Sequence, residues 1–479
     1  MFPCSVTQLI RIVSGQTTAP TADEPVTGVS IDSRTVKPGD AFFALPGSKS
    51  HGVLYADEAI ARGAVCVIAE STTAEQNQSR SPMVRFHSTD SVEIDSRIIR
   101  VPSALAALQQ LANWNRKQSA ALVIGVTGSV GKTTTRQMIA SVLNREFHGI
   151  QSPKNFNNEL GVPLSLLQLN AEHDFAALEL GAGRIGDIRK LAKIAQPEFG
   201  VITRVAQAHV ETFGSLDLIR QAKQELAEAI SSDGTVFLNA DDAAVRKMAD
   251  SVQGNVVLYG FSSDAHVRAT NIVTSTNRSV MTVDGREFQF QGPRHLATSA
   301  LAAIAVGRTT GMADSRIADG LAGFQLDAGR GRMVNREPWT VIDDSYNASP
   351  ASVIGAIQGL ADWPNSKHRI LVLGDMLELG QDSTAAHFEI GRQLASSTVD
   401  HTLVYGQFAE DVVKGAKSTG VTLNHISLFH NLATLQVMLD CIMTPGDVVL
   451  IKGSRGMQME NVVQWLQQQA AAYSTRAAA

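Results

Sequence analysis

The sequence lacks several features that mark particular classes of protein. It holds only three cysteines, Cys4, Cys66 and Cys441, and no C-x-x-C pair, so we expect neither a disulfide framework nor a structural zinc site. The formal net charge is −5, which argues against the basic surface that nucleic-acid-binding proteins carry. No apolar run reaches the roughly 18 residues that a membrane-spanning helix requires.

A secretory signal is also missing, because MFPCSVTQLIRIVSG has no basic start followed by an apolar stretch. We therefore expect a cytoplasmic monomer that neither spans a membrane nor binds nucleic acid. The chain has 479 residues, of which 44% are hydrophobic and 18% charged. Such a composition supports large buried cores, and the length suggests about three domains of roughly 150 residues.

The apolar patterns predict three α/β domains. Residues 1–115 form a small mixed domain with short strand patterns near 29–31 and 41–45. In residues 116–329, the runs ALVIGV, FAALEL, FGVI and TVFLN alternate with helical stretches, as in a parallel sheet. Residues 330–479 repeat this alternation as a Rossmann-like domain, but they lack the G-x-G-x-x-G of dinucleotide sites.

The stretch GVTGSVGKTTT, residues 125–135, is a candidate phosphate loop. It follows an apolar strand and opens a helix, so backbone N–H groups and the helix dipole would face an anion. A standard Walker loop would place a glycine at Val126. In this interpretation, Lys132 reaches the outer phosphates and Thr133 ligates Mg²⁺. The alternative is a glycine-rich turn with an incidental lysine, which the strand–loop–helix order disfavours.

Two further polar residues lie at expected strand ends. Glu179 closes the run FAALEL, and His209 follows the strand FGVI. In open α/β sheets, ligands gather at the carboxyl ends of the strands. Glu179 is thus a candidate metal ligand or water-orienting group. A single acid or histidine at a strand end is also a common structural feature.

The loop TGSVGKTT fits the pattern TG-[ST]-x-GKT-[ST] of the Mur ligases, the ATP-dependent amide-forming enzymes of peptidoglycan synthesis. The chain resembles this family over nearly its whole length. The strings that carry the resemblance are NFNNELGVPLSLL, LELGAGRIGDI, AHVETFGS, DDSYNASP, VLGDMLELG and KGSRGMQME. DDSYNASP and GDMLELG resemble the branch that joins D-alanyl-D-alanine to UDP-N-acetylmuramoyl-tripeptide.

The resemblance implies that ATP phosphorylates the tripeptide carboxylate and that the dipeptide amine then displaces phosphate to form the amide. A hinge near Gly329–Gly331 would close the domains around the reactants. The alternatives are a sister Mur ligase or a folylpolyglutamate-type ligase with another amino-acid substrate. Two further alternatives are not amide ligases: a P-loop ATPase that acts as a switch, and an inactive homologue that acts as a binding module.

The resemblance also implies roles for individual residues. The expected ATP-binding residues of the loop are Gly128, Ser129, Gly131, Lys132, Thr133 and Thr134. The expected metal ligands are Thr133, Glu179, His209 and Lys223. Lys223 matches the family lysine that CO₂ carbamylates, although an ordinary solvated helix lysine is the alternative. The expected catalytic residues are Lys132, Lys223 and His209.

Contacts outside the phosphate loop are implied in the same way. The residues matching further ATP contacts are Asn239, Arg332 and Asp344, although Asn239 also suits a turn and Arg332 a solvated linker. Those matching contacts to UDP-N-acetylmuramoyl-tripeptide are Ser33, Arg34, Asn155, Asn157 and Asn158. The basic residues expected to bind the free carboxylate of D-alanyl-D-alanine are Lys452 and Arg455.

The sequence departs from the family pattern at two places. His51-Gly52-Val53 stands where the family usually has D-G-H. Leu296 and Ser299 stand at the asparagine positions of G-x-H-N-x-x-N. The second departure removes an amide that would touch the adenine, so we expect the contacts to the nucleotide base to differ.

Overall fold

A computed structural model describes most of the chain as two compact units. The described residues are 1–17, 23–47, 50–71, 97–206, 210–275, 278–335, 337–420 and 425–478. The first unit comprises residues 1–125, 147–181 and 187–199. The second comprises residues 126–146, 182–186 and 200–479.

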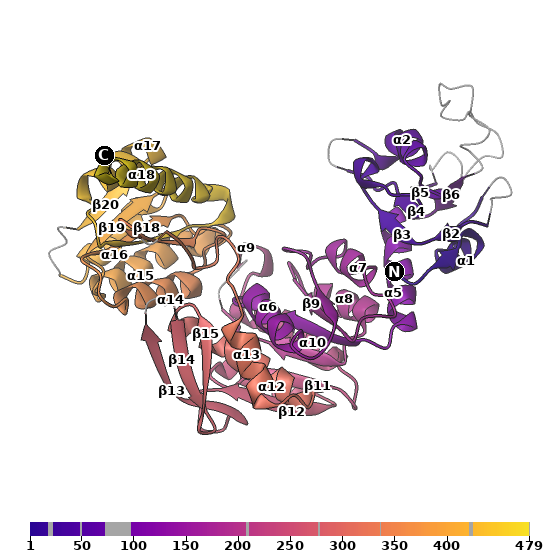
Figure 1. The fold of residues 1–479 in the computed structure, drawn as a ribbon, viewed down its shortest axis with the longest axis horizontal. Coiled ribbons are helices and arrows are strands. Elements are labelled where there is room, and N and C mark those ends of the chain that lie inside the picture. The colour runs from indigo at the N-terminus through magenta and orange to yellow at the C-terminus, as the bar shows by residue number, and fades with distance from the viewer. Residues whose placement is uncertain are drawn as a thin grey trace. The chain divides into compact units, whose positions relative to one another are not determined.

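The N-terminal part of the first unit holds a parallel four-stranded sheet (Figure 1). Its strands, in spatial order, are β3 (Gly28–Ser30), β4 (Asp40–Phe43), β5 (Cys66–Glu70) and β6 (Ile98–Val101). The helices beside it are α1 (Val6–Ile12), α2 (Ala56–Ala61) and α5 (Ala104–Gln118), and β1 (Cys4–Ser5) pairs antiparallel with β2 (Pro25–Val26). The strands predicted near 29–31 and 41–45 are confirmed as β3 and β4.

Residues 122–291 contribute the strands of a nine-stranded sheet in the order β15-β14-β13-β12-β11-β10-β7-β9-β8. These strands are β7 (Leu122–Thr127), β8 (Gly149–Gln151), β9 (Phe175–Glu179), β10 (Phe199–Ile202), β11 (Thr235–Asn239), β12 (Asn255–Gly260), β13 (Val267–Ser275), β14 (Arg278–Val283) and β15 (Arg286–Gln291). The predicted parallel pairing is found between β8 and β9 and between β11 and β12. The sequence did not predict that β13, β14 and β15 pair antiparallel.

The helix that follows β7 packs closely against two later helices. α6 (Lys132–Leu143) contacts α12 (Ala297–Thr309) and α13 (Asp314–Ala322). A Cβ on Gly320 would lie 2.5 Å from Cα of Val142, so glycine permits this approach. The remaining helices of this region are α7 (Gly161–Leu166), α8 (Asp187–Ala195), α9 (Val210–Phe213), α10 (Leu216–Ala229) and α11 (Ala243–Arg246).

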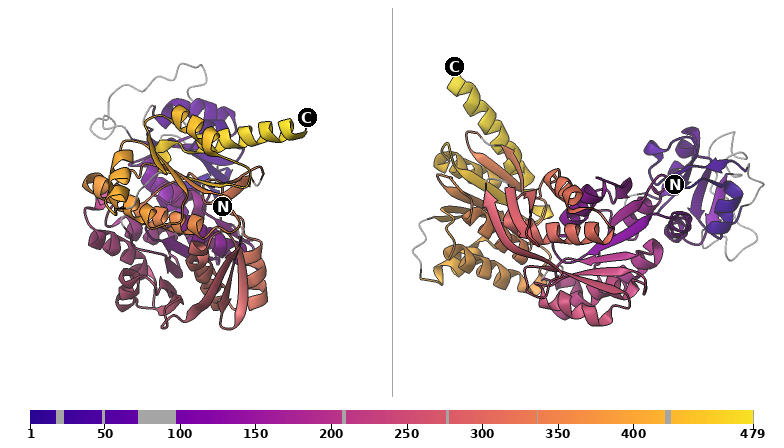
Figure 2. Two further views of the ribbon diagram at one scale, coloured as in Figure 1. Left: turned by 90° about the vertical axis from the view of Figure 1, so that its left-hand side faces the viewer. Right: turned by 60° about the horizontal axis from the view of Figure 1, so that its bottom comes forward.

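The C-terminal sheet has helices on both faces, as Figures 1 and 2 show. Its strands, in spatial order, are β16 (Arg332–Asn335), β17 (Thr340–Asp344), β21 (Val448–Lys452), β18 (Arg369–Gly374), β19 (His401–Tyr405) and β20 (Ile426–Phe429). One face packs on α14 (Pro350–Ala361), α15 (Ser383–Ala395) and α16 (Ala409–Lys417), and the other on α17 (Leu432–Ile442) and α18 (Glu460–Ala478).

Neighbouring residues of one strand point to opposite faces of this sheet. Ile370 belongs to the core under α17 and α18, while Leu371 belongs to the core under α14–α16. All pairings except that of β16 with β17 are parallel, so the predicted Rossmann-like arrangement is confirmed. Among the described residues, no helix is both long and apolar enough to cross a membrane.

Candidate active site

The loop between β7 and α6 has the geometry of an anion site. Gly131, at φ 88°, precedes the first residue of α6, and Gly128 has φ 146°. Nζ of Lys132 donates to the carbonyl oxygens of Gly128, at 2.8 Å, and Ser129, at 3.3 Å. The lysine therefore folds back over the loop, with its charge beside the N-terminus of α6. The predicted order of strand, glycine loop and helix is confirmed.

The segment after β10 braces this loop. Oγ1 of Thr203 donates to the Val130 carbonyl at 2.6 Å, and the Ser129 amide donates to the Arg204 carbonyl at 2.7 Å. A Cβ on Gly128 would lie 2.0 Å from Oγ1 of Thr203. The glycine at position 128 therefore provides room for the Thr203 side chain. The standard Walker spacing, which has its glycine at the position of Val126, does not account for this requirement.

Asn239, at the end of β11, supports the same bracing segment. Its Nδ2 donates to the Thr203 carbonyl at 2.8 Å, and its Oδ1 accepts from the Asp241 amide at 3.0 Å. The side chain is buried. In this structure Asn239 thus holds the segment that holds the phosphate loop.

A hydroxyl pair joins the first turn of α6 to α12. Oγ1 of Thr135 and Oγ of Ser299 lie 2.8 Å apart, and both residues are buried. Ser299 therefore places a short hydroxyl against the phosphate-loop helix where the family pattern has an amide. Leu296 packs on Gly292: a Cβ added to Gly292 would lie 2.7 Å from Cδ1 of Leu296.

In the first unit, Glu179 ends β9 and is buried. Its Oε1 accepts from Nδ2 of Asn157 at 2.9 Å, and its amide donates to Oγ of Ser152 at 3.2 Å. Oδ1 of Asn158 accepts from the Gly161 amide at 2.8 Å, so Asn158 supports the start of α7. Asn155 is exposed. The structure thus brings only Asn157, of these three asparagines, to Glu179.

Lys223 lies on α10 and is only 3% exposed, so the interpretation as a solvated helix lysine is wrong. Its Nζ lies 5.4 Å from the ring centroid of Phe213. His209 falls outside the described residues. Among those described, no three His, Cys, Asp or Glu side chains are grouped so as to hold a metal ion.

The carboxyl ends of β17 and β21 bring two predicted site residues together. Nζ of Lys452 donates to Oδ2 of Asp344 at 2.7 Å and to the Asn347 carbonyl at 3.0 Å. Lys452 is buried. Burial raises the pKa of Asp344, and the Lys452 charge opposes that rise. A residue expected at the nucleotide and one expected at the dipeptide are therefore direct partners.

A pocket lined in part by His295, Asp344 and Trp363 lies next to this pair. Burial, reinforced by the Lys452 charge, lowers the pKa of His295 to about 4. The His295 residue is nevertheless exposed, so solvent screens this effect.

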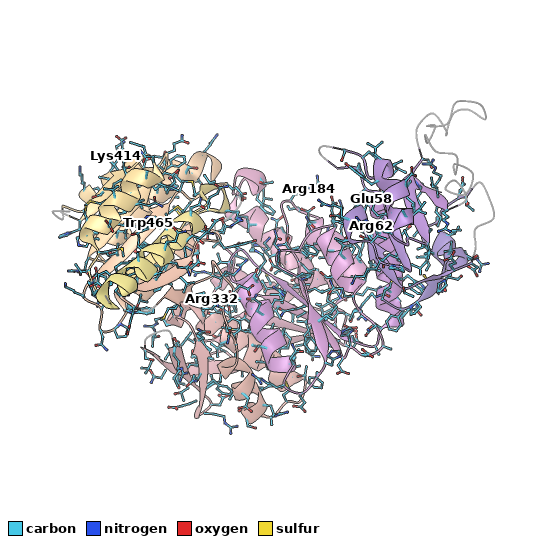
Figure 3. All side chains as sticks on the ribbon, turned by 45° about the horizontal axis from the view of Figure 1, so that its top comes forward. Glu58, Arg62, Arg184, Arg332, Lys414 and Trp465 are labelled. Carbon is cyan, nitrogen blue, oxygen red and sulfur yellow. The ribbon has the colours of Figure 1, made fainter. Side chains whose placement is uncertain are left out.

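Two arginines flank Tyr346, in the DDSYNASP segment. The guanidinium of Arg330 lies 4.1 Å from the ring centroid, and that of Arg455 lies 6.0 Å away. Arg455 also donates to Oε1 of Glu460 at 2.9 Å. Arg332, labelled in Figure 3, is exposed at the start of β16. Sequence reasoning missed Arg330, whose signal was its place in the same G-R-G-R run.

The predicted hinge glycines are tied to Asp343, another residue that the sequence analysis missed. The Gly329 amide donates to Oδ2 of Asp343 at 2.8 Å, and the Gly331 amide donates to its carbonyl at 2.7 Å. Both glycines have positive φ, 76° and 83°. The linker before β16 is therefore anchored by the strand that ends at Asp344.

In the N-terminal sheet, Oγ of Ser33 donates to Oε2 of Glu58 at 2.7 Å. Nε of Arg62 also donates to Glu58, at 3.3 Å, and Figure 3 labels both residues. Arg34 is exposed and donates twice to Asp32, at 2.9 and 2.6 Å. These hydrogen bonds lower the pKa of Asp32 to about 2. Ser33 is held by Glu58, whereas the Arg34 charge faces solvent.

Three sequence patterns of known domains match successive parts of the chain. The Mur ligase family catalytic domain matches residues 25–116, the Mur ligase middle domain residues 126–307, and the Mur ligase glutamate ligase domain residues 329–455. A UDP-N-acetylmuramoyl-tripeptide–D-alanyl-D-alanine ligase from Escherichia coli is 32% identical, with 98% of this chain and 99% of the relative covered.

Solved structures show the same likeness. MurF from Acinetobacter baumannii superposes with a TM-score of 0.84 at 28% identity, covering 97% of this chain and 99% of its own. MurF ligase from Thermotoga maritima in complex with ADP gives a TM-score of 0.80 at 27% identity, covering 94% and 99%. Both the sequence matches and the three-domain α/β architecture agree with the resemblance seen in the motifs. The chain belongs to the Mur ligase family.

Proposed function

We propose that this chain joins D-alanyl-D-alanine to UDP-N-acetylmuramoyl-tripeptide in an ATP-dependent reaction, as a cytoplasmic step of peptidoglycan precursor synthesis. The observation that carries this conclusion is the match, over nearly the full length of both chains, to a ligase of that name. The β7–α6 loop with Lys132 folded over it supplies the matching nucleotide chemistry.

The nucleotide phosphates bind over residues 128–134 in this proposal. Backbone N–H groups at the start of α6 face the phosphates, and Lys132 exchanges its carbonyl partners for phosphate oxygens. Arg332 and Asp344 contribute phosphate and ribose contacts, since a guanidinium suits phosphoryl oxygens and a carboxylate accepts from hydroxyls. Asn239 acts at the same site, and its support of Thr203 favours an indirect contribution.

Mg²⁺ is assigned to Thr133, Glu179, His209 and Lys223, with the doubly charged ion neutralising phosphate oxygens when bound. The buried hydroxyl of Thr133 and carboxylate of Glu179 are the hard oxygen donors that this ion prefers. An ammonium group cannot ligate a cation. Reaction of the neutral Lys223 amine with CO₂ releases one proton and forms a carbamate, whose oxygens can.

The reaction then follows from phosphate transfer to a carboxylate. The tripeptide carboxylate attacks the γ-phosphorus of ATP, the bond from this phosphorus to the β–γ bridging oxygen breaks, and the products are an acyl phosphate and ADP. The amine of D-alanyl-D-alanine attacks the acyl carbon, phosphate leaves, and the amine loses a proton as the amide forms. Lys132 stabilises the charge that develops on the transferred phosphoryl group.

The two organic substrates contact residues from different parts of the sequence. Ser33 and Arg34 contact the UDP-sugar, for which the exposed Arg34 charge is suited. Asn155, Asn157 and Asn158 offer amides to the amino-sugar peptide. Lys452 and Arg455 attract the dipeptide carboxylate. Arg455 is exposed, so exchanging its Glu460 partner costs only about 0–1 kcal/mol.

The test is an incubation with ATP, Mg²⁺, UDP-N-acetylmuramoyl-tripeptide and D-alanyl-D-alanine, followed by product mass measurement. We expect a pentapeptide product and one phosphate released per amide, both lost in Lys132→Met. Replacing the amine by D-glutamate, a diamino acid or L-glutamate separates the sister ligases. ATP hydrolysis without an amide product from any of these amines would instead support a P-loop ATPase that acts as a switch.

A further inference from the structure

The segment that follows β18 is held at the carboxyl end of the C-terminal sheet by its own first residue. The carboxylate of Asp375 accepts from the Gln407 amide at 2.7 Å and the Phe408 amide at 3.2 Å. Its carbonyl accepts from the Ser454 amide at 3.0 Å. Asp375 is buried. These bonds fix only the start of the segment, and its next residue has a different partner.

That partner is His387, a buried side chain on α15 for which the proposed mechanism has no use. The ring is 1% exposed and stacks on Phe408, with 4.7 Å between centroids. Nε2 lies 3.0 Å from the Met376 amide nitrogen, and Nδ1 lies 2.7 Å from the Ser383 carbonyl oxygen. The histidine thus bridges α15 and the backbone of the GDMLELG segment.

The two backbone partners determine the protonation state of His387. The Met376 amide can only donate, so Nε2 must carry a lone pair. The Ser383 carbonyl can only accept, so Nδ1 must carry the hydrogen. A second proton on Nε2 would place two N–H groups against each other. Only the neutral Nδ1–H tautomer therefore completes the bridge.

Other charges around the ring favour protonation, but burial outweighs them. Asp375 lies 3.9 Å from Nε2, and Asp411 on α16 also acts on the ring. Burial is the largest influence and lowers the pKa of His387 below its usual value. The ring is consequently neutral at physiological pH and retains its acceptor.

From Met376 the connection continues to the segment that carries Lys452 and Arg455. The Leu377 amide donates to Oγ of Ser454 at 2.8 Å, and this hydroxyl donates to the Ala348 carbonyl at 3.3 Å. Ser454 thereby links the three motif segments DDSYNASP, GDMLELG and KGSRGM. Disturbing Met376 would therefore reach Arg455 through Leu377 and Ser454.

The exposed surface of these segments suits a small peptide with methyl side chains and a free carboxylate. Leu377 is 39% exposed. A Cβ on Gly456 would lie 2.8 Å from Cδ1 of Leu377, so the leucine packs on the backbone next to Arg455. An exposed apolar side chain thus packs on the backbone that carries the exposed Arg455.

We propose that His387 is a positioning residue for the dipeptide, holding Leu377 and the Arg455 segment in place through the Met376 amide and Ser454. This inference rests on the proposed function for the identity of the amine substrate. It assigns to His387 no contact with any reacting atom. Its effect should therefore fall on one substrate and should depend on the acceptor at Nε2.

Two variants separate the acceptor from the rest of the ring. His387→Gln can place an amide oxygen near the Nε2 position, while His387→Asn retains a donor near Nδ1 but cannot reach Met376. We expect His387→Asn to raise the KM for D-alanyl-D-alanine about tenfold, with KM for ATP and for the UDP-tripeptide within about twofold. We expect His387→Gln to lie much closer to the unmodified enzyme.

A measurement that needs no turnover accompanies the kinetics. In hydrogen exchange, the Met376 and Leu377 amides should exchange faster in His387→Asn than in His387→Gln, with the β19 amides unchanged. As the pH falls through the lowered pKa of His387, kcat/KM for the dipeptide should fall in the unmodified enzyme. The ratio of kcat/KM in the unmodified enzyme to kcat/KM in His387→Gln should show this fall, because glutamine does not titrate.

Parallel increases of all three KM values, or equal exchange rates in both variants, would overturn the positioning role. Loss of folding in His387→Asn leaves His387→Gln and the pH profile of the unmodified enzyme to decide. If the unmodified enzyme forms no amide with this dipeptide, the proposed function fails. The exchange measurement would still report whether His387 holds the segment.

Discussion

Nζ of Lys452 lies 2.7 Å from Oδ2 of Asp344, although 108 residues separate them in the chain. The two residues are register partners at the ends of the parallel strands β21 and β17. The ion pair is mostly buried, with side-chain exposures of 3% and 19%. Burial raises the pKa of Asp344, and the positive charge of Lys452 favours the ionised carboxylate. The pair joins a residue expected to contact the nucleotide to one expected to contact the dipeptide.

Removing only the lysine should be worse than removing both charges. Lys452→Met leaves a buried carboxylate without its cation, so we expect the free energy of unfolding to fall by about 3–5 kcal/mol. The double variant Lys452→Met, Asp344→Asn should lose less free energy of unfolding than Lys452→Met alone. Because the pKa of Asp344 is raised in the folded state, the deficit of Lys452→Met should shrink as the pH falls and the carboxyl protonates. Urea unfolding at several pH values measures this, and strictly additive effects would contradict it.

Gly128→Ala should disable nucleotide binding. Its Cβ would lie 2.0 Å from Oγ1 of Thr203, and its φ of 146° is unfavourable for alanine. Displacing the loop should lower kcat/KM for ATP by about 100-fold. Gly311→Ala is the matched control, since Gly311 also has positive φ, 84°, but has no atom near its would-be Cβ. The control should lose about 1 kcal/mol of stability with activity retained.

Lys223→Ala should lose activity by about 100-fold or more, because a ligand of the proposed Mg²⁺ site is missing. Acetate or propionate should restore part of the rate by supplying the lost carboxylate group. Lys223→Arg, which cannot form the carbamate and leaves less room, should not respond. If no acid improves a folded Lys223→Ala enzyme, the carbamate is not part of the site.

Acid should destabilise the protein through His295. Burial lowers the pKa of His295 to about 4, so the folded state binds its proton less readily than the unfolded chain. The associated stability is present above the usual histidine pKa and is lost as the pH falls toward that lowered value. Because His295 is exposed, solvent screening should keep this loss small. His295→Gln should flatten the dependence of unfolding free energy on pH in this range. An unchanged slope would contradict the lowered pKa of His295.

Ser299→Ala should affect both stability and nucleotide use. The hydroxyl lies 2.8 Å from Oγ1 of Thr135 in a buried place, so its loss should cost about 1 kcal/mol. KM for ATP should rise because the first turn of α6 carries Lys132 and Thr133. Ser279→Ala is the control, since Ser279 is also buried and donates to the Gly292 carbonyl at 2.9 Å. A similar change of KM in both variants would contradict a specific link to the phosphate loop.

Local patterns were sufficient to predict the phosphate loop and the alternation of strands and helices. The apolar run before TGSVGKTTT, its glycines and the helical period after it lie within a few turns of one another, so each determines its neighbour's backbone. The family resemblance and the candidate residues Lys132, Glu179 and Asp344 also came from short strings. The sequence by itself therefore determined the nucleotide chemistry and the parallel α/β character of the chain.

The tertiary structure decided which distant residues meet. Strand order in the C-terminal sheet places β21 beside β17, and only that order pairs Lys452 with Asp344. The sequence left a solvated helix lysine as the alternative for Lys223, and the burial of this side chain excludes that alternative. Likewise, the antiparallel extension β13–β15 and the bridge from His387 to Met376 depend on which surfaces remain to be covered once the sheets form. Such pairings arise from packing across long sequence separations, which no local periodicity encodes.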